Sequence, residues 1–386
     1  MIRRSKVYLK GAYGPGNFGD DVLLICMIKI LKEVFVSSDI TISINDISAG
    51  NQFDSDVNWV PLNSPIFSDI TVLGGGGQFF SFKHNSVARN KNTYFIPWLI
   101  QKYKQGYTLI DMIIGFYLRK RYGISYKTKN LATFCIGVGP FENGNDKECQ
   151  RAIKIFQYAD FLSVRDRVSK ELIFEMCNKD SFQFVDITLN RELWYNNNKR
   201  IVNKENKNVK PVVGIIIREW TLTDIGSKII SRLLDFEHQH KEYDYVYISF
   251  YKKYDVNVIN KLEGRKTIIW DPIEFTVNSF IAKIKETCNV IVSTRAHGVL
   301  LSTMAYIPSI AVEIEPKLEA VQKMMPLSVQ LVKNDKLDDL STYIDSALNY
   351  QESDFIRKVD DDLNNNSTIA KESILRLKEW LEKVKE

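Results

Sequence analysis

The stretch "GPGNFGDDVLL" (residues 14–24) decides how the first half of the chain folds, because it joins an apolar, strand-like run to a helix-like one. Its glycines have the spacing G-x-G-x-x-G, which is typical of a loop that binds a dinucleotide pyrophosphate at a helix N-terminus. Asp20 and Asp21 follow the last glycine at once, and carboxylates at this point repel a pyrophosphate. We therefore expect a strand, a tight turn and a helix, with Asp20 as an N-cap or a catalytic carboxylate, and no nicotinamide or flavin site.

Composition narrows the class of protein. The chain has 386 residues, 45% of them apolar and 26% charged, with a net charge of +5. Basic and acidic residues are interleaved, so no nucleic-acid partner is expected. Five dispersed cysteines favour neither disulfides nor zinc, and no cluster has metal-ligand spacing, so we expect no metal and no bound cofactor. No signal peptide and no apolar run of spanning length is recognised, which predicts a cytoplasmic protein.

Strand-like and helix-like segments alternate along most of the chain, and this rhythm predicts parallel sheets covered by helices. An Asn- and Lys-rich linker at 191–211 divides the pattern. We expect an N-terminal α/β lobe over 1–190 and a C-terminal α/β lobe over 212–350, both Rossmann-like, with a cleft between them. An amphipathic helical tail over 351–386 is expected to pack back on the N-terminal lobe.

An apolar and aromatic insertion at about 83–130 departs from this rhythm and ends in a basic run. It is either a helical excursion that covers the sheet or a patch that touches anionic lipid or a lipid-linked substrate.

Four consecutive glycines, Gly74 to Gly77, directly follow the strand-like run "DITVL". They predict either a sharp structural turn or a place where a ligand approaches the backbone closely. Because ligands bind at the carboxyl ends of parallel strands, we favour the interpretation that a ligand approaches the backbone here. His84 follows the run and is expected to line the same site.

The second lobe offers cations at two strand ends. Ser293, Arg295 and His297 lie between a strand and a helix in "STRAHGVLLSTMAYIPSIAVE" (293–313), and Arg218 ends the strand "VVGIII". Arginine presents a planar fork to a carboxylate or phosphate, and histidine moves protons near neutral pH. The arginine at 218 is either a surface ion pair or, with Arg295, a clamp for a small dianion.

Taken in order, four segments resemble the polysaccharide pyruvyl transferase family: "GAYGPGNFGDDVLL", "DITVLGGGGQFF", "DFLSVRDRVS" and "STRAHGVLLSTMAYIPSIAVEIEPK". The resemblance implies a GT-B-like fold and the transfer of pyruvyl from phosphoenolpyruvate to a sugar of a surface polysaccharide, such as a capsule or exopolysaccharide. The product is a pyruvate ketal and the by-product is phosphate. By motif match, the resemblance places the donor on Arg218, Arg295 and His297, to which we add Ser293.

Chemistry then suggests the remaining roles. His297 would be the acid and Asp20 or Asp21 the base. The acceptor sugar would be nucleotide-linked, lipid-linked or polymeric, with peripheral membrane contact at the inner face as an option. Its binding residues would be Asn17, Gly75, Gly76, Gly77 and His84.

Two other functions stay open at this point. One is a GT-B-like glycosyltransferase that uses a nucleotide sugar. The other is an inactive binding member of a polysaccharide assembly complex. A Rossmann dehydrogenase ranks last.

Overall fold

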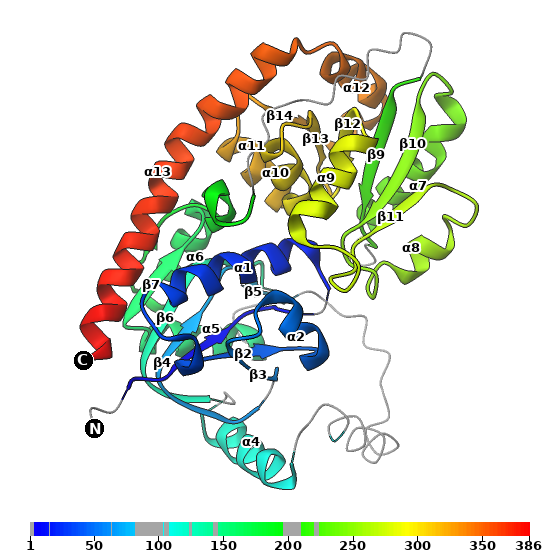
Figure 1. Ribbon diagram of the computed structural model, residues 1–386. Helices are drawn as coiled ribbons and strands as arrows, with labels where there is room; N and C mark the ends of the chain where they lie inside the picture. The colour runs from blue at the N-terminus through cyan, green and yellow to red at the C-terminus, as the bar shows by residue number, and fades with distance from the viewer. Residues whose placement is uncertain are drawn as a thin grey trace. The chain divides into compact units, whose positions relative to one another are not determined.

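A computed structural model describes residues 4–14, 16–62, 64–81, 103, 108–122, 126–141, 146–195, 210–219 and 224–386. The chain forms two compact α/β units (Figure 1). The first comprises Met1–Pro15, Leu23–Ile187 and Ala370–Glu386, and the second comprises Gly16–Val22 and Thr188–Ile369. The sequence had assigned all of 1–190 to the first lobe, but the short segment Gly16–Val22 makes its contacts in the second unit. Most of the linker and most of the insertion at 83–130 lie outside the described residues.

The first unit is built on a parallel sheet of order β3-β2-β1-β4-β6-β7-β8, with β5 paired to β6. Its strands are β1 (Val7–Lys10), β2 (Ile40–Ile44), β3 (Asn58–Pro61), β4 (Ile66–Leu73), β5 (Gly76–Phe79), β6 (Tyr126–Val138), β7 (Phe161–Val164) and β8 (Phe182–Gln183). β1, β4 and β6 run through the core and are buried along most of their length. Near-continuous apolar runs such as "DITVL" form these strands because helices cover both faces of a parallel sheet.

Side-chain caps define where the helices of the first unit begin. Asp146 accepts a hydrogen bond from the backbone of Cys149 at 2.8 Å, and Asp166 accepts one from Ser169 at 2.7 Å. The helices are α1 (Phe18–Lys32), α2 (Ile47–Phe53), α4 (Leu109–Tyr122), α5 (Lys147–Tyr158) and α6 (Arg167–Cys177). Residues 18–22 of α1 are grouped with the second unit and the rest with the first.

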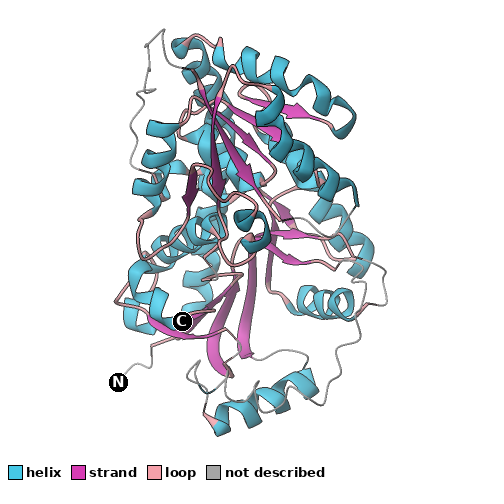
Figure 2. Cartoon of the chain, turned by 90° about the vertical axis from the view of Figure 1, so that its right-hand side faces the viewer, coloured by secondary structure: helices cyan, strands magenta, loops and turns pink. Residues whose placement is uncertain are grey.

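The second unit has a six-stranded parallel sheet of order β11-β10-β9-β12-β13-β14. The strands are β9 (Val212–Ile217), β10 (Asp244–Ser249), β11 (Thr267–Ile269), β12 (Val290–Ser293), β13 (Ser309–Val312) and β14 (Val329–Val332). The helices are α7 (Asp224–Gln239), α8 (Val256–Asn260), α9 (Val277–Thr287), α10 (Ala296–Met304), α11 (Pro316–Met324), α12 (Leu340–Leu348) and α13 (Glu352–Lys385). Figure 2 shows both sheets with helices beside them.

Helix α13 matches the helical tail expected over 351–386, and its residues divide between the units at Ile369 and Ala370. In the second unit Asp362 accepts hydrogen bonds from the backbone of Leu327 and Ser328. In the first, Trp380 packs against Phe161 with ring centroids 5.9 Å apart.

In both units the first strand lies between the second and the fourth in chain order, which is the doubly wound arrangement with a switch point beside its first strand. Ligands bind at the carboxyl ends of the strands at such a point. In the second unit the two strands at the switch point are β9 and β12, and in the first they are β1 and β4. The residues that follow these strands are therefore the place to look for a site.

Candidate active site

Arg218 and Arg295 come directly from the switch point of the second unit. Arg218 is the residue after β9, and Arg295 lies two residues after β12. The two strands pair in parallel, with Ile216 opposite Ser293, so their carboxyl ends meet at one edge of the sheet. The sequence placed both arginines at strand ends, and the topology brings them together.

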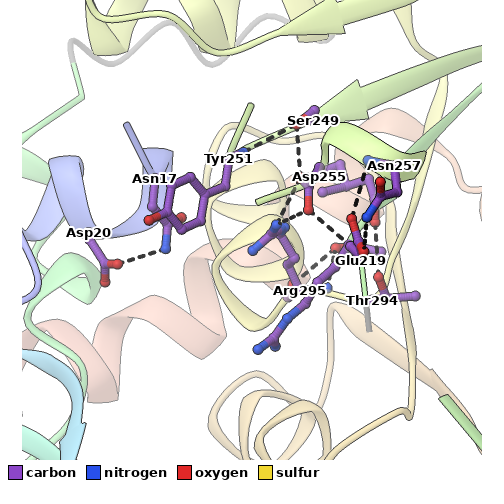
Figure 3. A network of polar contacts seen from close by, with 12 residues as sticks. Asn17, Asp20, Glu219, Ser249, Tyr251, Asp255, Asn257, Thr294 and Arg295 are labelled. Atoms are coloured by element: carbon purple, nitrogen blue, oxygen red, sulfur yellow. Dashed lines mark hydrogen bonds and ion pairs between the residues drawn. The ribbon is translucent and has the colours of Figure 1, made fainter. Parts of the chain in front are cut away.

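Arg295 is fixed by a buried carboxylate. Its Nη2 donates to both oxygens of Asp255, at 2.7 and 2.8 Å, and Asp255 is fully buried. Asp255 also accepts from Ser249 Oγ at 2.8 Å and from the backbone of Glu219 at 3.0 Å (Figure 3). The Nε of Arg295 is buried and has no hydrogen-bond partner among the residues that the structure describes. One edge of the guanidinium is thus anchored, and a strong donor remains for another acceptor.

Arg218 has a similar arrangement with Glu315, the residue before α11. Its Nη1 donates to Glu315 Oε1, and the carboxylate is almost completely buried. Burial lowers the pKa of Arg218, and Glu315 opposes this shift, while the positive charge of Arg295 adds to it. Both side chains follow strand ends at the same edge of the sheet, so their charges act on one another. Each arginine has its own buried counter-ion, so the pair presents directed N–H groups rather than excess positive charge.

Ser293 holds the turn between β12 and α10. Its hydroxyl donates to the carbonyl of Arg295 at 2.9 Å and accepts from the Arg295 backbone N–H at 3.0 Å. The side chain is completely buried. A Cβ on Gly298 would lie 2.3 Å from this hydroxyl, so glycine is needed there for the helix to begin. Ser293 therefore supports the turn that presents Arg295, and its own contact with a donor stays a prediction.

His297 lies in the first turn of α10, directly against the turn that begins α1. A Cβ on Gly19 would meet His297 Nδ1 at 2.3 Å and Cγ at 2.7 Å. The third glycine of the opening stretch thus allows an imidazole to approach the backbone. This is the physical reason for a glycine there, and it differs from the pyrophosphate contact that the G-x-G-x-x-G spacing suggests.

An aromatic cluster holds the first turn of α1 in the second unit. Phe18 donates its backbone N–H to the carbonyl of Phe250 at 2.8 Å. The Phe18 ring packs against Phe250, Trp270 and Phe280 at centroid distances of 4.8, 4.8 and 4.7 Å. These contacts explain why residues 16–22 belong with the second sheet.

The same turn carries the two carboxylates. Asn17 Nδ2 donates to Asp20 Oδ2 at 2.7 Å, and Trp270 Nε1 donates to the fully buried Asp21 at 2.7 Å. Asp21 is thus a structural anchor, and Asp20 is the partly exposed carboxylate of the pair. Tyr251, whose ring lies beside Asn17 in Figure 3, has a raised pKa because of burial, Tyr254 and the charge of Asp20. Its hydroxyl therefore keeps its proton near neutral pH.

The glycine run lies in the first unit, at the carboxyl end of β4. A Cβ on Gly74 would meet the Tyr13 hydroxyl at 2.2 Å, and one on Gly75 would touch Leu23 at 3.0 Å. Gly76 has φ +94°, and it begins β5 with Gly77. Tight packing and a sharp turn are sufficient to explain these glycines, and an acceptor contact stays a prediction. His84 lies outside the described residues.

Among the residues that the structure describes, no group of three or more His, Cys, Asp or Glu side chains could hold a metal ion. That the reaction needs no metal and no cofactor stays a prediction. Within the same residues, no helix combines the length and the apolar character required to cross a bilayer.

Sequence reasoning missed the two carboxylates that organise the site. Glu315 follows β13 in "VEIEPK", so its position at a strand end was a usable signal. Asp255 lies in the polar stretch "FYKKYD" after β10, which resembles an exposed loop. Its complete burial depends on the turn at 249–255 folding back against Arg295, which no local pattern indicates.

Solved structures share this fold. Sucrose-phosphate synthase from Thermosynechococcus elongatus matches with a TM-score of 0.54 and 11% identity, covering 98% of this chain and 99% of that one. The Methanocaldococcus jannaschii UDP-GlcNAc 2-epimerase, solved with UDP-GlcNAc and UDP, gives 0.52 and 12%, covering 90% and 94%. The Neisseria meningitidis UDP-GlcNAc 2-epimerase, bound to UDP-GlcNAc, gives 0.52 and 11%, covering 96% and 100%. At such low identity these likenesses show the fold alone, which is the GT-B-like pair of parallel-sheet α/β domains expected from the sequence.

A search of curated proteins finds no match to the sequence. The model of one protein family, described as polysaccharide pyruvyl transferase, matches residues 17–316. The match begins at Asn17, in the turn against His297, and ends at Pro316, beside Glu315. It therefore includes the two arginines, Arg218 and Arg295, and their buried carboxylates, which together we call the arginine site. The resemblance seen in the four sequence segments is thereby confirmed: the chain belongs to the polysaccharide pyruvyl transferase family.

Proposed function

We propose that the protein transfers the pyruvyl group of phosphoenolpyruvate to two hydroxyls of a sugar in a surface-polysaccharide precursor or polymer, forming a cyclic ketal and releasing phosphate. Family membership supports a transferase. The observation that carries the choice of donor is the pair of guanidinium groups at the switch point, each oriented by a buried carboxylate. Phosphoenolpyruvate has a carboxylate and a phosphate, and two planar forks suit these two groups.

His297 is suited to protonate the donor. It lies two residues after Arg295, in the first turn of α10, and is held against Gly19. In the proposed step its proton goes to the methylene carbon of phosphoenolpyruvate, which becomes a methyl group. A sugar hydroxyl forms a bond to the neighbouring carbon and gives its proton to a base. Asp20, positioned by Asn17 and partly exposed, is the proposed base.

Closure of the ketal then needs the phosphate to leave. The C–O bond to phosphate breaks, and the second sugar hydroxyl bonds to the same carbon while its proton goes to the departing phosphate. The arginines stabilise the negative charge that develops on that phosphate. One phosphoenolpyruvate and one diol therefore give one ketal and one inorganic phosphate, and the scheme uses no oxidant and no external cofactor.

The nature of the acceptor is the less specified part of the proposal. Nucleotide-linked, lipid-linked and polymeric sugars all supply neighbouring hydroxyls. Two of the structural relatives are bound to UDP-GlcNAc, which makes a nucleotide-linked sugar a reasonable first acceptor to assay.

Donor binding tests the proposal directly. A ligand that binds only the folded state stabilises it by about 2.7 kcal/mol at a hundredfold excess over its dissociation constant. We expect phosphoenolpyruvate to raise the melting temperature of the wild type and of Arg232→Ala, an exposed arginine of the same unit that pairs with Asp338. Arg295→Lys keeps a cation beside Asp255 but loses the fork, so the shift should disappear there.

The alternatives give other results. A shift with UDP-GlcNAc and none with phosphoenolpyruvate would favour a nucleotide-sugar glycosyltransferase. No shift with either, together with no phosphate release from phosphoenolpyruvate and sugar diols, would favour an inactive binding member of an assembly complex. His297→Asn with undiminished phosphate release would remove the acid role.

A further inference from the structure

Tyr251 of the second unit is held beside the arginine site by the same loop that buries Asp255. Its backbone N–H donates to the hydroxyl of Ser249 at 3.3 Å, and that hydroxyl donates to Asp255 at 2.8 Å. The Tyr251 carbonyl accepts hydrogen bonds from the backbone N–H groups of Tyr254 at 3.0 Å and of Asp255 at 2.9 Å. The contacts that place the counter-ion of Arg295 therefore also fix the backbone from which the Tyr251 side chain extends (Figure 3).

The ring of Tyr251 packs against a second ring on the same loop. The centroids of Tyr251 and Tyr254 lie 4.7 Å apart, at an interplanar angle of 34°. Tyr254 is 66% exposed, whereas Tyr251 is half-buried. A tyrosine at a ligand site offers an apolar face together with a polar tip. The reaction proposed above uses neither ring, although the loop that carries them also carries Asp255.

The hydroxyl of Tyr251 is a hydrogen-bond donor without a fixed acceptor. It forms no hydrogen bond with any residue that the structure describes. Burial raises the pKa of the phenol, Tyr254 and Asp20 raise it further, and Arg295 opposes them. Figure 3 shows the ring between Arg295 and the turn that carries Asn17 and Asp20. The hydroxyl is therefore protonated near neutral pH, within electrostatic reach of both the proposed base and the arginine site.

The charges near Tyr251 indicate which kind of ligand its hydroxyl suits. The carboxylates of Asp20 and Asp21 both act on the phenol, and carboxylates repel an anion such as phosphoenolpyruvate. A sugar hydroxyl is neutral, and it can accept a hydrogen bond at its oxygen while it donates one to a carboxylate. The side of Tyr251 toward Asp20 therefore suits a sugar diol, whereas Arg295 suits the anion.

We propose that Tyr251 binds the acceptor sugar. Its hydroxyl donates to the oxygen of one hydroxyl of the diol, Asp20 accepts the proton of the neighbouring hydroxyl, and the ring packs against C–H groups of the sugar. Tyr251 keeps its own proton, so the proton balance of the reaction is unchanged. The inference rests on the proposed function for the role of the sugar as acceptor, but the binding of a sugar diol at Tyr251 can be measured without turnover.

Saturation-transfer NMR on the full chain tests the inference, because it detects a bound sugar directly. The probes are methyl galactoside, methyl mannoside and UDP-GlcNAc, each with and without saturating phosphoenolpyruvate. We expect at least one probe to bind the wild type, and to bind Tyr251→Phe about three- to tenfold more weakly, since one neutral hydrogen bond is lost. Tyr254→Phe removes the same group from the neighbouring exposed ring, and it should bind as the wild type does.

The same variants separate a binding role from a structural one. Because the hydroxyl bonds to no described residue, Tyr251→Phe should melt within about 2 °C of the wild type. Its melting shift with phosphoenolpyruvate should be unchanged. In phosphate-release assays Tyr251→Phe should raise the KM for the sugar and alter kcat little, as expected for a group that binds the ground state and the transition state alike.

Three outcomes overturn the inference: none of the three probes binds the wild type, Tyr251→Phe binds them as well as Tyr254→Phe does, or Tyr251→Phe loses the phosphoenolpyruvate shift and keeps sugar binding. In the last case the hydroxyl belongs with the arginines. The proposed function fails separately. A wild type that binds a sugar through Tyr251, but neither binds phosphoenolpyruvate nor releases phosphate, contradicts pyruvyl transfer and supports the sugar site.

Discussion

Replacing Asp255 by asparagine tests whether the arginine site is organised as described. The carboxylate is fully buried and accepts hydrogen bonds from Arg295, from Ser249 and from the backbone of Glu219. Asparagine has the same shape, but it replaces one acceptor oxygen with an NH2 group that would face donors. It also leaves the Arg295 charge buried without its counter-ion.

The expected cost follows from this geometry. Removing one partner of a buried ion pair typically destabilises a protein by about 3–5 kcal/mol, because the other charge is left uncompensated. The side chain of Arg295 is 11% exposed, and the remaining amide oxygen can still accept one bond, so the lower end applies. We expect Asp255→Asn to cost about 3 kcal/mol, and in a unit of roughly 190 residues this lowers the melting temperature by about 6–12 °C.

A double-mutant cycle with Arg295→Met gives the sharper assay. Once the guanidinium is absent, the buried carboxylate has no counter-ion to lose, and Asp255→Asn should cost little or become stabilising. Urea unfolding of the wild type, both single variants and the double variant should give a coupling of about 2–3 kcal/mol. If Asp255→Asn costs the same in both backgrounds, or melts within about 2 °C of the wild type, the ion pair does not organise the site.

Three further outcomes are expected. Gly19→Ala would place a Cβ 2.3 Å from His297 Nδ1, so we expect it to lower the free energy of unfolding in urea by about 1–3 kcal/mol. It should also move the His297 imidazole signals in NMR, and an unchanged spectrum would contradict the contact. Gly14 and Gly16 both have positive φ, but only at Gly14 would a Cβ collide, at 1.8 Å from an isoleucine side-chain carbon. Gly14→Ala should therefore lower the melting temperature more than Gly16→Ala does, and equal decreases would refute this reasoning. Burial and a neighbouring arginine lower the pKa of Lys285 to about 8 in the folded protein, whereas its ordinary pKa is 10.5. Between these two pH values the unfolded state holds more protons than the folded state, so the stability of the fold rises with pH. The rise measured by melting from pH about 8 to about 9.5 should be smaller in Lys285→Met, and parallel curves would show that another group is responsible.

The sequence predicted the architecture because the signals for it are local. An apolar run followed by Gly, Asp or Ser and then by a helix repeats through both halves, and each repeat is one strand and its crossover. The short strand β14 could not be predicted as such, since "VQLV" is too brief to show a period.

The site residues also divide into those that local sequence signals predict and those that only the tertiary structure brings to the site. Arg218 and Arg295 could be predicted, because the carboxyl ends of neighbouring parallel strands meet whatever the loops do. Asp255 could not, since its burial arises from tertiary contact between the loop after β10 and the turn after β12. The glycines were recognised as special, but the reason differed from site to site: the approach of an imidazole at Gly19, and tight packing at Gly74 and Gly75.

Pairing each arginine with a buried carboxylate has a consequence for recognition. An uncompensated pair of guanidinium groups would attract many small anions and would repel one another when unoccupied. With Asp255 and Glu315 in place, the unoccupied site is close to neutral, and an anion gains from donors already aimed at it rather than from net charge. Such a site discriminates by the positions of acceptor oxygens, because an anion that cannot reach the buried Nε of Arg295 leaves that donor unsatisfied. A ligand with a carboxylate and a phosphate on one rigid, planar carbon frame meets that requirement better than inorganic phosphate, which has one centre of charge for two forks.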